Sequence, residues 1–304
     1  MRVTVPLLFL AMIAGYVAKP VPAFSPTVIG GYAVLAGDFH IHMFPFDAST
    51  LSPWDAVVEA RRRGLEVIAL TGHNNVWTAK VGRWFSRLTG GPMVLVGEEI
   101  ISPPYDLIAV GLDHSVDWRG AVAQSVAEIH RQGGVAIAAH PLRSYWPAFD
   151  AAGMANLDGA EVLHPTRWLD PSFADELEQF FGRKLLTAIG SSDFHGLSYI
   201  GFSRTYVFVR EKTEKGVLEA LRQHRTVVVD RDGRMFGDAS LIDLVNSFGE
   251  LPPSGQLPEL DAWASLSRWL ALGGLLGGVL FGFRARSRGV YPVLSSTQNG
   301  VIPN

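Results

Sequence analysis

The segment GDFHIH at residues 37–42 ends a short apolar run and carries two histidines, His40 and His42, two positions apart. Alternate side chains of a β-strand point to the same face, so both imidazoles can reach one metal ion. A single pair of this kind would mean little. This pair decides the interpretation of the chain because similar clusters end other apolar runs.

Four further clusters of histidine or carboxylate side chains follow apolar runs along the chain. They are Thr71 to Asn74 with His73, Gly97 to Glu99, Ala139 to Pro141 with His140, and Ser192 to His195 with Asp193. Parallel α/β folds bind ligands at the carboxyl ends of their strands, where distant parts of the sequence converge. The clusters therefore predict one metal centre and not a series of unrelated side chains.

Apolar runs alternate with helical patterns between about residues 32 and 229, which is typical of a parallel α/β sheet or barrel. Ser52, Pro53 and Asp55 form a helix-start signal, and Gly64 marks the end of the same predicted helix. The apolar runs are mostly continuous, as in strands that are buried on both faces. We expect one folded domain over residues 30–248.

The composition narrows the class of ligand. The chain has 304 residues, a net charge of −3 and no cysteine. A slightly acidic protein offers no electrostatic reason to expect nucleic acid, so a small-molecule partner is expected. The absence of cysteine excludes thiolate metal sites, disulfides and cysteine nucleophiles. Any metal must therefore be held by nitrogen and oxygen atoms, and nothing indicates the oligomeric state.

The N-terminal segment differs from the middle of the chain. An apolar run at residues 3–18 follows Arg2, and this pattern predicts a signal peptide or signal anchor over residues 1–25. Cleavage is left open, because residues 17–18 and 21–23 are both candidate sites. Beyond the folded domain, residues 249–262 are predicted to form a linker.

Residues 263–283 are mostly apolar, and three arginines follow closely after them. This pattern predicts a transmembrane helix with its C-terminal end in the cytoplasm and a disordered tail at residues 284–304. Arg268 shortens the apolar core, so the alternative is an amphipathic helix that packs on the domain or lies on a membrane surface. The two termini predict a membrane-anchored or exported protein of the cell envelope, with its folded domain outside the cytoplasm.

Five segments occur in a specific order and spacing: GDFHIH, SPWDAVVEARRRGLEVIALTGHN, GEE, GGVAIAAHP and GSSDFHG. In these segments the chain resembles the polymerase and histidinol phosphatase (PHP) family of metal-dependent phosphoesterases, over most of residues 35–230. The resemblance implies an α/β fold, a distorted seven-stranded (β/α)7 barrel flanked by the apolar terminal segments. It also implies two or three divalent ions, Mn, Fe or Zn, at the C-terminal mouth of the barrel.

The resemblance implies metal ligands at His40, His42, Asp47, His73, Glu99, Asp106, His140, Asp193 and His195. Glu99 fits the family spacing better than Glu98. Two positions depart from the family pattern, since Gly72 stands where an aspartate is common and Asp106 where many members have a histidine. Asp106 can still bind a metal through its carboxylate, whereas Gly72 removes a group that would orient the site.

The predicted reaction is hydrolysis of a small-molecule phosphate mono- or diester by a metal-activated water. Arg143 and Arg204 are candidates for binding the phosphate oxygens, because a guanidinium matches their geometry. His114 and His164 are candidates for protonating the leaving oxygen.

Two other functions remain open. The departure at Gly72 favours a non-catalytic metal-binding or sensor module. Alternatively, the same metal chemistry would hydrolyse a non-phosphate ester or an amide. Arg143 and Arg204 are the residues that favour phosphate.

Overall fold

The structure is a computed structural model that describes residues 4–18, 27–196, 198–248, 251–252 and 261–287. The candidate cleavage site at residues 21–23, most of the predicted linker and the tail beyond residue 287 lie outside the described residues.

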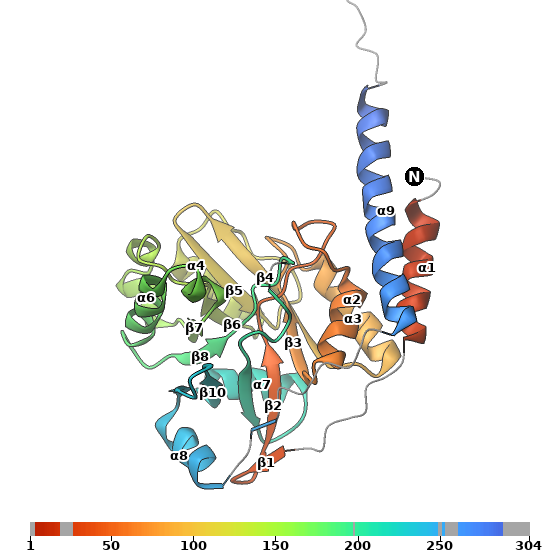
Figure 1. The fold of residues 1–304 in the computed structure, drawn as a ribbon. Helices are drawn as coiled ribbons and strands as arrows, with labels where there is room; N and C mark the ends of the chain where they lie inside the picture. Colours follow the sequence, from red (N-terminus) through yellow and green to blue (C-terminus); the bar gives the residue numbers. More distant parts are fainter. Residues whose placement is uncertain (1–3, 19–26, 197, 249–250, 253–260, 288–304) are drawn as a thin grey trace, which may run out of the picture.

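One mixed sheet forms the centre of the described residues (Figure 1). It has eleven strands in the order β11-β10-β9-β2-β3-β4-β5-β6-β7-β8, with β1 paired to β2. The strands are β1 Thr27–Ile29, β2 Tyr32–Asp38, β3 Val67–Leu70, β4 Met93–Ser102, β5 Tyr105–Val110, β6 Val135–Ala138, β7 Gly159–Leu163, β8 Thr187–Gly190, β9 Thr205–Val209, β10 Thr226–Val229 and β11 Met235–Gly237. Strands β2, β3, β4, β6, β7 and β8 run in one direction, because β5 is antiparallel to both of its neighbours.

The helices lie outside this sheet (Figure 1). They are α1 Thr4–Val17, α2 Pro53–Arg62, α3 Trp77–Thr89, α4 Val122–Arg131, α5 Ala151–Ala155, α6 Pro171–Phe181, α7 Glu214–Arg222, α8 Ala239–Phe248 and α9 Ala262–Ser287, with 3-10 turns at Trp146–Ala148 and Pro165–Trp168. Helix α2 begins as predicted: Pro53 occupies its first turn, and the Ser52 hydroxyl accepts a hydrogen bond from the Asp55 backbone N–H at 3.1 Å.

The sheet is nearly closed. Thr205 of β9 accepts a hydrogen bond from the Gly190 backbone N–H of β8 at 2.9 Å and donates to the Gly190 carbonyl at 2.8 Å. Thr226 of β10 donates to the Ala188 carbonyl at 2.9 Å. The α/β class and the barrel-like sheet are therefore confirmed. The seven-strand count is not confirmed, since the sheet contains eleven strands and several antiparallel pairs.

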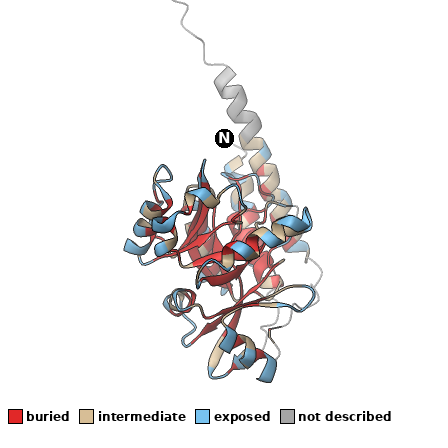
Figure 2. Cartoon of the chain, turned by 90° about the vertical axis from the view of Figure 1, so that its left-hand side faces the viewer, coloured by how far each residue is buried: buried red, intermediate tan, exposed pale blue. Residues whose placement is uncertain are grey.

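Buried residues are concentrated in the sheet (Figure 2). Every residue of β3, β6, β7 and β8 is buried, as the continuous apolar runs predicted. The same burial makes the few charged side chains of the sheet conspicuous, because a charge is rarely buried without partners.

Helices α1 and α9 pack side by side next to α2 (Figure 1). Gly15 of α1 leaves room for Ser267 of α9, whose Oγ would lie 3.2 Å from a β-carbon at that glycine. The Ser267 hydroxyl donates to the Asp55 carboxylate of α2 at 2.5 Å. The guanidinium of Arg268 pairs with Glu59 of α2. Polar contacts thus fasten the start of α9 to the domain.

These contacts accompany a correction. Among the described helices, none combines the length and the apolar character needed to cross a bilayer. The prediction of a transmembrane helix at residues 263–283 is therefore wrong, and the membrane partner expected through this helix loses its support. The physical reason is visible at Arg268, whose charge interrupts the apolar segment and is paired with Glu59.

Candidate metal centre

The predicted ligands and His164, a predicted proton donor, come from separate strands and meet at one end of the sheet. His40 and His42 follow β2, His73 follows β3, Glu99 lies in β4, Asp106 lies in β5, His140 follows β6, His164 follows β7, and Asp193 and His195 follow β8. Convergence at the carboxyl ends of parallel strands was the basis of the prediction, and the geometry agrees with it.

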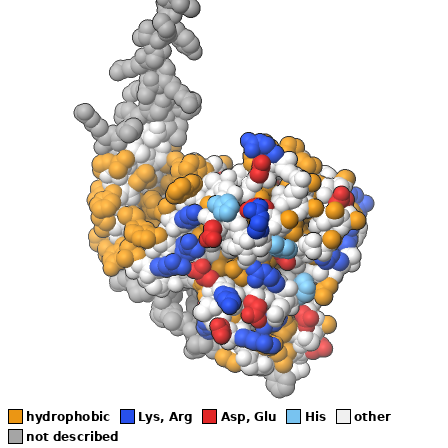
Figure 3. Space-filling model, turned by 180° about the vertical axis from the view of Figure 1, so that it is seen from behind, with side chains coloured by type: hydrophobic (Ala, Val, Ile, Leu, Met, Phe, Trp, Pro, Cys, Tyr) orange, Lys and Arg blue, Asp and Glu red, His pale blue; other side chains and the backbone are white. Residues whose placement is uncertain are grey.

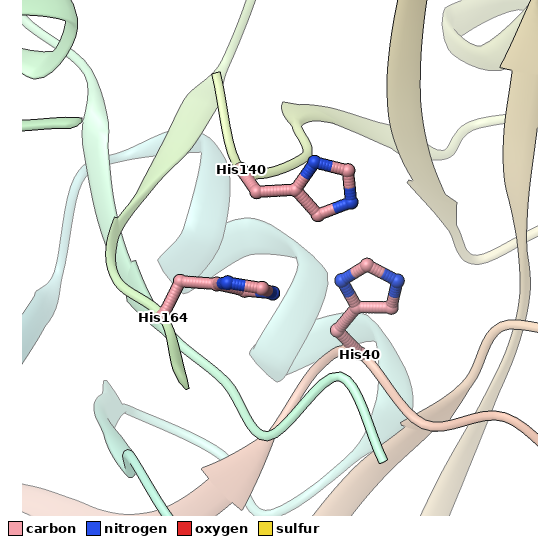
Figure 4. Close-up of side chains that lie close together, drawn as sticks. All are labelled: His40, His140 and His164. Atoms are coloured by element: carbon pink, nitrogen blue, oxygen red, sulfur yellow. The ribbon is translucent and has the colours of Figure 1, made fainter. Parts of the chain in front are cut away.

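Four groups of three side chains place their ligand atoms within 4.8 Å of one another. The groups are His40 with His140 and His164, His42 with His73 and His195, His40 with His42 and Asp193, and Glu99 with Asp106 and His140. Figure 4 shows the first group, whose three rings face a common space. All donors are imidazole nitrogens or carboxylate oxygens, which suit Mn, Fe and Zn without selecting among them.

Glu99 lies between the groups. Its Oε2 is 3.3 Å from His40 Nε2, 3.4 Å from His42 Nε2 and 3.2 Å from His73 Nε2. Its Oε1 is 3.1 Å from His140 Nε2. The two oxygens of this carboxylate are therefore directed to different imidazoles, so Glu99 would contribute to more than one group of ligands.

Glu98 faces elsewhere, which supports the choice of Glu99. The Glu98 carboxylate accepts a hydrogen bond from the Val116 backbone N–H at 2.6 Å, away from the histidines. Neighbouring residues of a strand point to opposite faces, so only one member of the pair can reach the cluster.

Unpartnered buried atoms test whether these residues fit a metal. Nε2 of His164 and Oδ1 of Asp193 are buried and form no hydrogen bond with any residue that the structure describes. In addition, Nε2 of His40 and Nε2 of His42 lie only 2.9 Å apart, so they need a proton or a cation between them. A divalent cation would supply the missing partner in each case, and the residues therefore fit a metal.

Asp47 contacts the opposite side of two rings. Its Oδ2 lies 3.5 Å from His42 Nδ1, and its Oδ1 lies 3.2 Å from His73 Nδ1. Oδ1 also accepts a hydrogen bond from the His73 backbone N–H at 3.0 Å. This position orients both rings with Nε2 toward Glu99. Direct binding of a metal by Asp47 stays a prediction.

Glu161 of β7 belongs to the site and was missed in the sequence. Its Oε1 lies 3.0 Å from His40 Nδ1, and its Oε2 accepts a hydrogen bond from the His140 backbone N–H at 2.5 Å. The Ser191 hydroxyl donates to the same carboxylate. The available signal was a single acidic residue in an otherwise apolar strand, where an unpaired charge would be costly.

Asp38 has a structural position beside the site. It is fully buried, and its carboxylate accepts hydrogen bonds from the backbone N–H groups of His40 at 3.3 Å, Ser192 at 3.1 Å and Gly201 at 2.7 Å. It therefore joins the end of β2 to the loop that carries Asp193. Burial raises the pKa of Asp38 to about 6, although these hydrogen bonds oppose the shift.

Carboxylates raise the proton affinity of the histidines. Burial alone would lower the pKa of His140, but its hydrogen bond to Glu99 and the charges of Glu99, Glu161 and Asp193 raise it to about 9. Burial would raise the pKa of Glu161, but nearby imidazoles, chiefly His40, hold it at about 2. Burial also opposes ionisation of Glu99 and Asp193, yet His40 keeps the pKa of both well below the usual range. The carboxylates thus create a potential that attracts cations.

Two candidate ligands have a left-handed backbone. His140 has a backbone φ of 25° and Asp193 has a backbone φ of 42°, values that residues other than glycine rarely adopt. Such strain persists only where the surroundings enforce it, and it is concentrated at functional sites.

His164 joins the ligand candidates, although the sequence pointed to a proton donor. Its Nδ1 accepts a hydrogen bond from the Thr166 backbone N–H at 3.2 Å, and its Nε2 lies 3.3 Å from Asp193 Oδ2. An imidazole held in this way presents Nε2 to the cluster.

The structure does not bring His114, Arg143 and Arg204 to the cluster. His114 is exposed and lies 3.3 Å from Glu128 of α4. Arg143 donates to Gln179 of α6 at 3.1 Å and is largely exposed. Arg204 is buried and donates to the carbonyl of Arg63 at the C-terminal end of α2. The expected phosphate-binding arginines and one expected proton donor therefore lie elsewhere.

Two comparisons with known proteins bear on this chain, one with a sequence relative and one with a solved structure. No family model matches the chain. An uncharacterized protein, MJ1587 of Methanocaldococcus jannaschii, is 30% identical over 148 residues, which cover 43% of this chain and 82% of the relative. A two-domain protein from Bacteroides vulgatus, which contains a predicted PHP-like metal-dependent phosphoesterase, superposes with a TM-score of 0.59 and 22% identity over 74% of this chain and 73% of that protein. This second likeness establishes the fold.

Proposed function

The chain belongs to the family of the M. jannaschii protein MJ1587 and has the fold of a PHP-like protein, and on this basis we propose that it is a metal-dependent phosphoesterase. The observation that carries the proposal is the convergence of histidines and carboxylates from distant strands into overlapping groups of ligand atoms. A fold alone does not define a reaction, so the site carries the argument.

The ions and the residues of the site would have different roles in such a reaction. Two or three divalent ions of Mn, Fe or Zn would supply a nucleophile from water at neutral pH and would stabilise charge on the phosphoryl oxygens. Glu99 would offer one carboxylate oxygen toward His40, His42 and His73 and the other toward His140. Asp47 and Glu161 orient the imidazoles, and His195, partly exposed, lies on the solvent side, where the substrate enters.

The departure at Gly72 does not leave a gap. A β-carbon there would lie 3.1 Å from Asp47 Oδ2 and 3.0 Å from Thr78 Oγ1. The Asp47 carboxylate occupies the space that a larger residue would take, and it orients the rings of His42 and His73. This contact supports catalysis over the sensor-module alternative, which rested on the departure at Gly72.

A second candidate is a metal-dependent hydrolase of a non-phosphate ester or amide. The observation that favours it is the position of Arg143 and Arg204, which face other elements and not the cluster. Without them, the choice of phosphate rests on the resemblance to the PHP family and on the ions themselves, which can clamp phosphoryl oxygens.

The test is hydrolysis of p-nitrophenyl phosphate and bis-p-nitrophenyl phosphate by the full chain loaded with Mn. We expect metal-dependent turnover that falls at least about 100-fold in His40→Ala, since this ligand belongs to two groups. His130→Ala is the matched control, because His130 pairs with Asp158 away from the cluster. Hydrolysis of p-nitrophenyl acetate, but of neither phosphate ester, would replace this proposal with the second candidate.

Export is a separate proposal that rests only on the apolar run at residues 3–18. N-terminal sequencing of the protein from fractionated cells tests it. A periplasmic or extracellular product would support export, and recovery only from the cytoplasm would contradict it.

A further inference from the structure

An apolar cavity of about 190 Å³ lies between the segment after β2, helices α2 and α3, and the terminal helices. Its wall includes Phe44 and Phe46 after β2, Trp54 of α2, and Trp77 and Val81 of α3. Leu8 of α1 and Leu275 of α9 complete it on the other side. The accessible surface of this wall is apolar.

The cavity is built by the segments that also supply ligands. Phe44 and Phe46 lie between His42 and Asp47, in the segment that follows β2. Trp77 begins α3, shortly after His73, in the segment that follows β3. Both segments follow strands at the end of the sheet where the candidate metal ligands meet.

Thr78 brings the wall of the cavity close to Asp47. Thr78 lines the cavity, and its Oγ1 would lie 3.0 Å from a β-carbon at Gly72. Asp47 Oδ2 would lie 3.1 Å from the same point. The carboxylate that orients His42 and His73 is thus a near neighbour of the apolar wall.

Large side chains at the cavity remain exposed. Phe46 is 63% exposed and Trp77 is 68% exposed. Figure 3 shows that apolar side chains also gather on the terminal helices, where Phe9, Tyr16 and Trp269 are exposed. An exposed apolar patch of this kind marks a binding surface when it adjoins a site.

We infer that the cavity binds the apolar part of the substrate, so that the substrate class is a phosphate ester with an alkyl or aryl chain. The inference rests on the proposed function and deepens it. The cavity wall belongs to the segments that carry His42, Asp47 and His73, and Thr78 of the wall lies close to Asp47. This continuity favours a substrate chain over a protein partner or a bilayer. Leu275 makes α9 part of this binding site, and Leu8 does the same for α1 in the protein that retains its N-terminal segment.

The test compares kcat/KM for ethyl, butyl and hexyl phosphate, each used below the concentration at which it self-associates. We expect kcat/KM to rise by about threefold or more for each methylene that enters the cavity. The measured quantity is the ratio of kcat/KM for hexyl phosphate to kcat/KM for ethyl phosphate, which we call the hexyl-to-ethyl ratio. A general loss of activity cancels from this ratio.

Two variants of α3 locate the effect. Val81→Asp places a charge in the wall of the cavity and should reduce the hexyl-to-ethyl ratio to nearly one. Leu88→Asp is the matched control, because Leu88 is an exposed residue of the same helix outside the wall, and it should keep the wild-type ratio. Trp77→Ser is a second variant with the same expected loss as Val81→Asp.

The inference would be overturned by a hexyl-to-ethyl ratio near one in the wild type. It would also be overturned if Val81→Asp and Trp77→Ser both kept the wild-type ratio. A preference for the longer ester that appears only in phosphatidylcholine vesicles would contradict it as well. If no ester is hydrolysed at all, the proposed function fails, and calorimetric binding of the same esters then tests the cavity separately. Tighter binding of hexyl than ethyl phosphate, lost in Val81→Asp, would still support an apolar-chain site. Equal binding would exclude it.

Discussion

Oε1 of Glu161 lies 3.0 Å from Nδ1 of His40, and both side chains are fully buried. A carboxylate at Nδ1 fixes the ring and directs Nε2 to the position where a metal would bind. Because the second oxygen of Glu161 accepts the His140 backbone N–H at 2.5 Å, one buried group positions two candidate ligands.

Glu161→Gln should weaken metal binding by about 10–100-fold, because the amide cannot hold His40 Nδ1–H and the His140 N–H in the same way. Isothermal titration with Mn or Zn measures the loss. Glu98→Gln is the matched control, since Glu98 is equally buried in a strand but faces Val116. Equal affinities in the wild type and Glu161→Gln would show that Glu161 does not position the ligands.

Gly72→Ala should lower metal affinity severalfold. The new β-carbon would lie 3.1 Å from Asp47 Oδ2, so the carboxylate must shift and loosen His42 and His73. The same titration measures the effect. Gly182→Ala is the control, because a β-carbon there meets its nearest atom at 3.4 Å, an ordinary contact. Wild-type affinity in Gly72→Ala would mean that the loop relaxes without disturbing Asp47.

Metal binding should release protons at neutral pH and should tighten as pH rises toward 9. Without metal, the pKa of His140 is about 9 after the opposing effect of burial, because Glu99, Glu161 and Asp193 favour its charged form. A metal needs the neutral imidazole, so it must displace that proton. For the metal-free protein, this raised pKa contributes stability that is complete below about 6.5 and is lost as pH rises through about 9.

Titrations in buffers of different ionisation enthalpy count the protons released. A pH-independent affinity between pH 6 and 9 would rule out this competition, because this range runs from below the ordinary pKa of about 6.5 up to the raised pKa of about 9. His130→Ala should release the same number of protons as the wild type, since His130 pairs with Asp158 outside the cluster.

Glu59 should make the attachment of α9 sensitive to acid. Burial opposes ionisation of Glu59, but Arg268, Arg63 and Arg62 lower its pKa below the ordinary value of 4.5. The stabilisation is therefore present above about pH 4.5 and is lost as pH falls through the lower pKa of the folded state. Glu59→Gln should imitate the loss at neutral pH and cost about 1–3 kcal/mol.

Urea unfolding and limited proteolysis of α9 measure this change. Glu66→Gln is a suitable control, because Glu66 pairs with Lys212 at the surface. If Glu59→Gln unfolded like the wild type and α9 stayed protected, the ion pairs would not be what holds the helix.

The candidate ligands could be predicted because each motif is local and each follows a strand, and parallel strands bring their carboxyl ends together. Other features depend on partners that no local pattern reveals. Arg143 faces Gln179 and Glu176 of α6, and Arg268 faces Glu59, which is far away in the sequence. Glu161 was missed because a lone acidic residue in an apolar strand does not indicate which distant histidine it contacts.

The packing of α1 against α9 has a consequence for synthesis. Among the described helices, α1 leaves the ribosome first and α9 last, so the first cannot meet its partner until translation is nearly complete. The sheet between them can fold while the apolar side chains of α1 are still uncovered. A slow or interrupted end to translation would therefore leave a folded barrel whose helix α1 still exposes its apolar side chains. A chaperone that binds exposed apolar segments should associate with this intermediate.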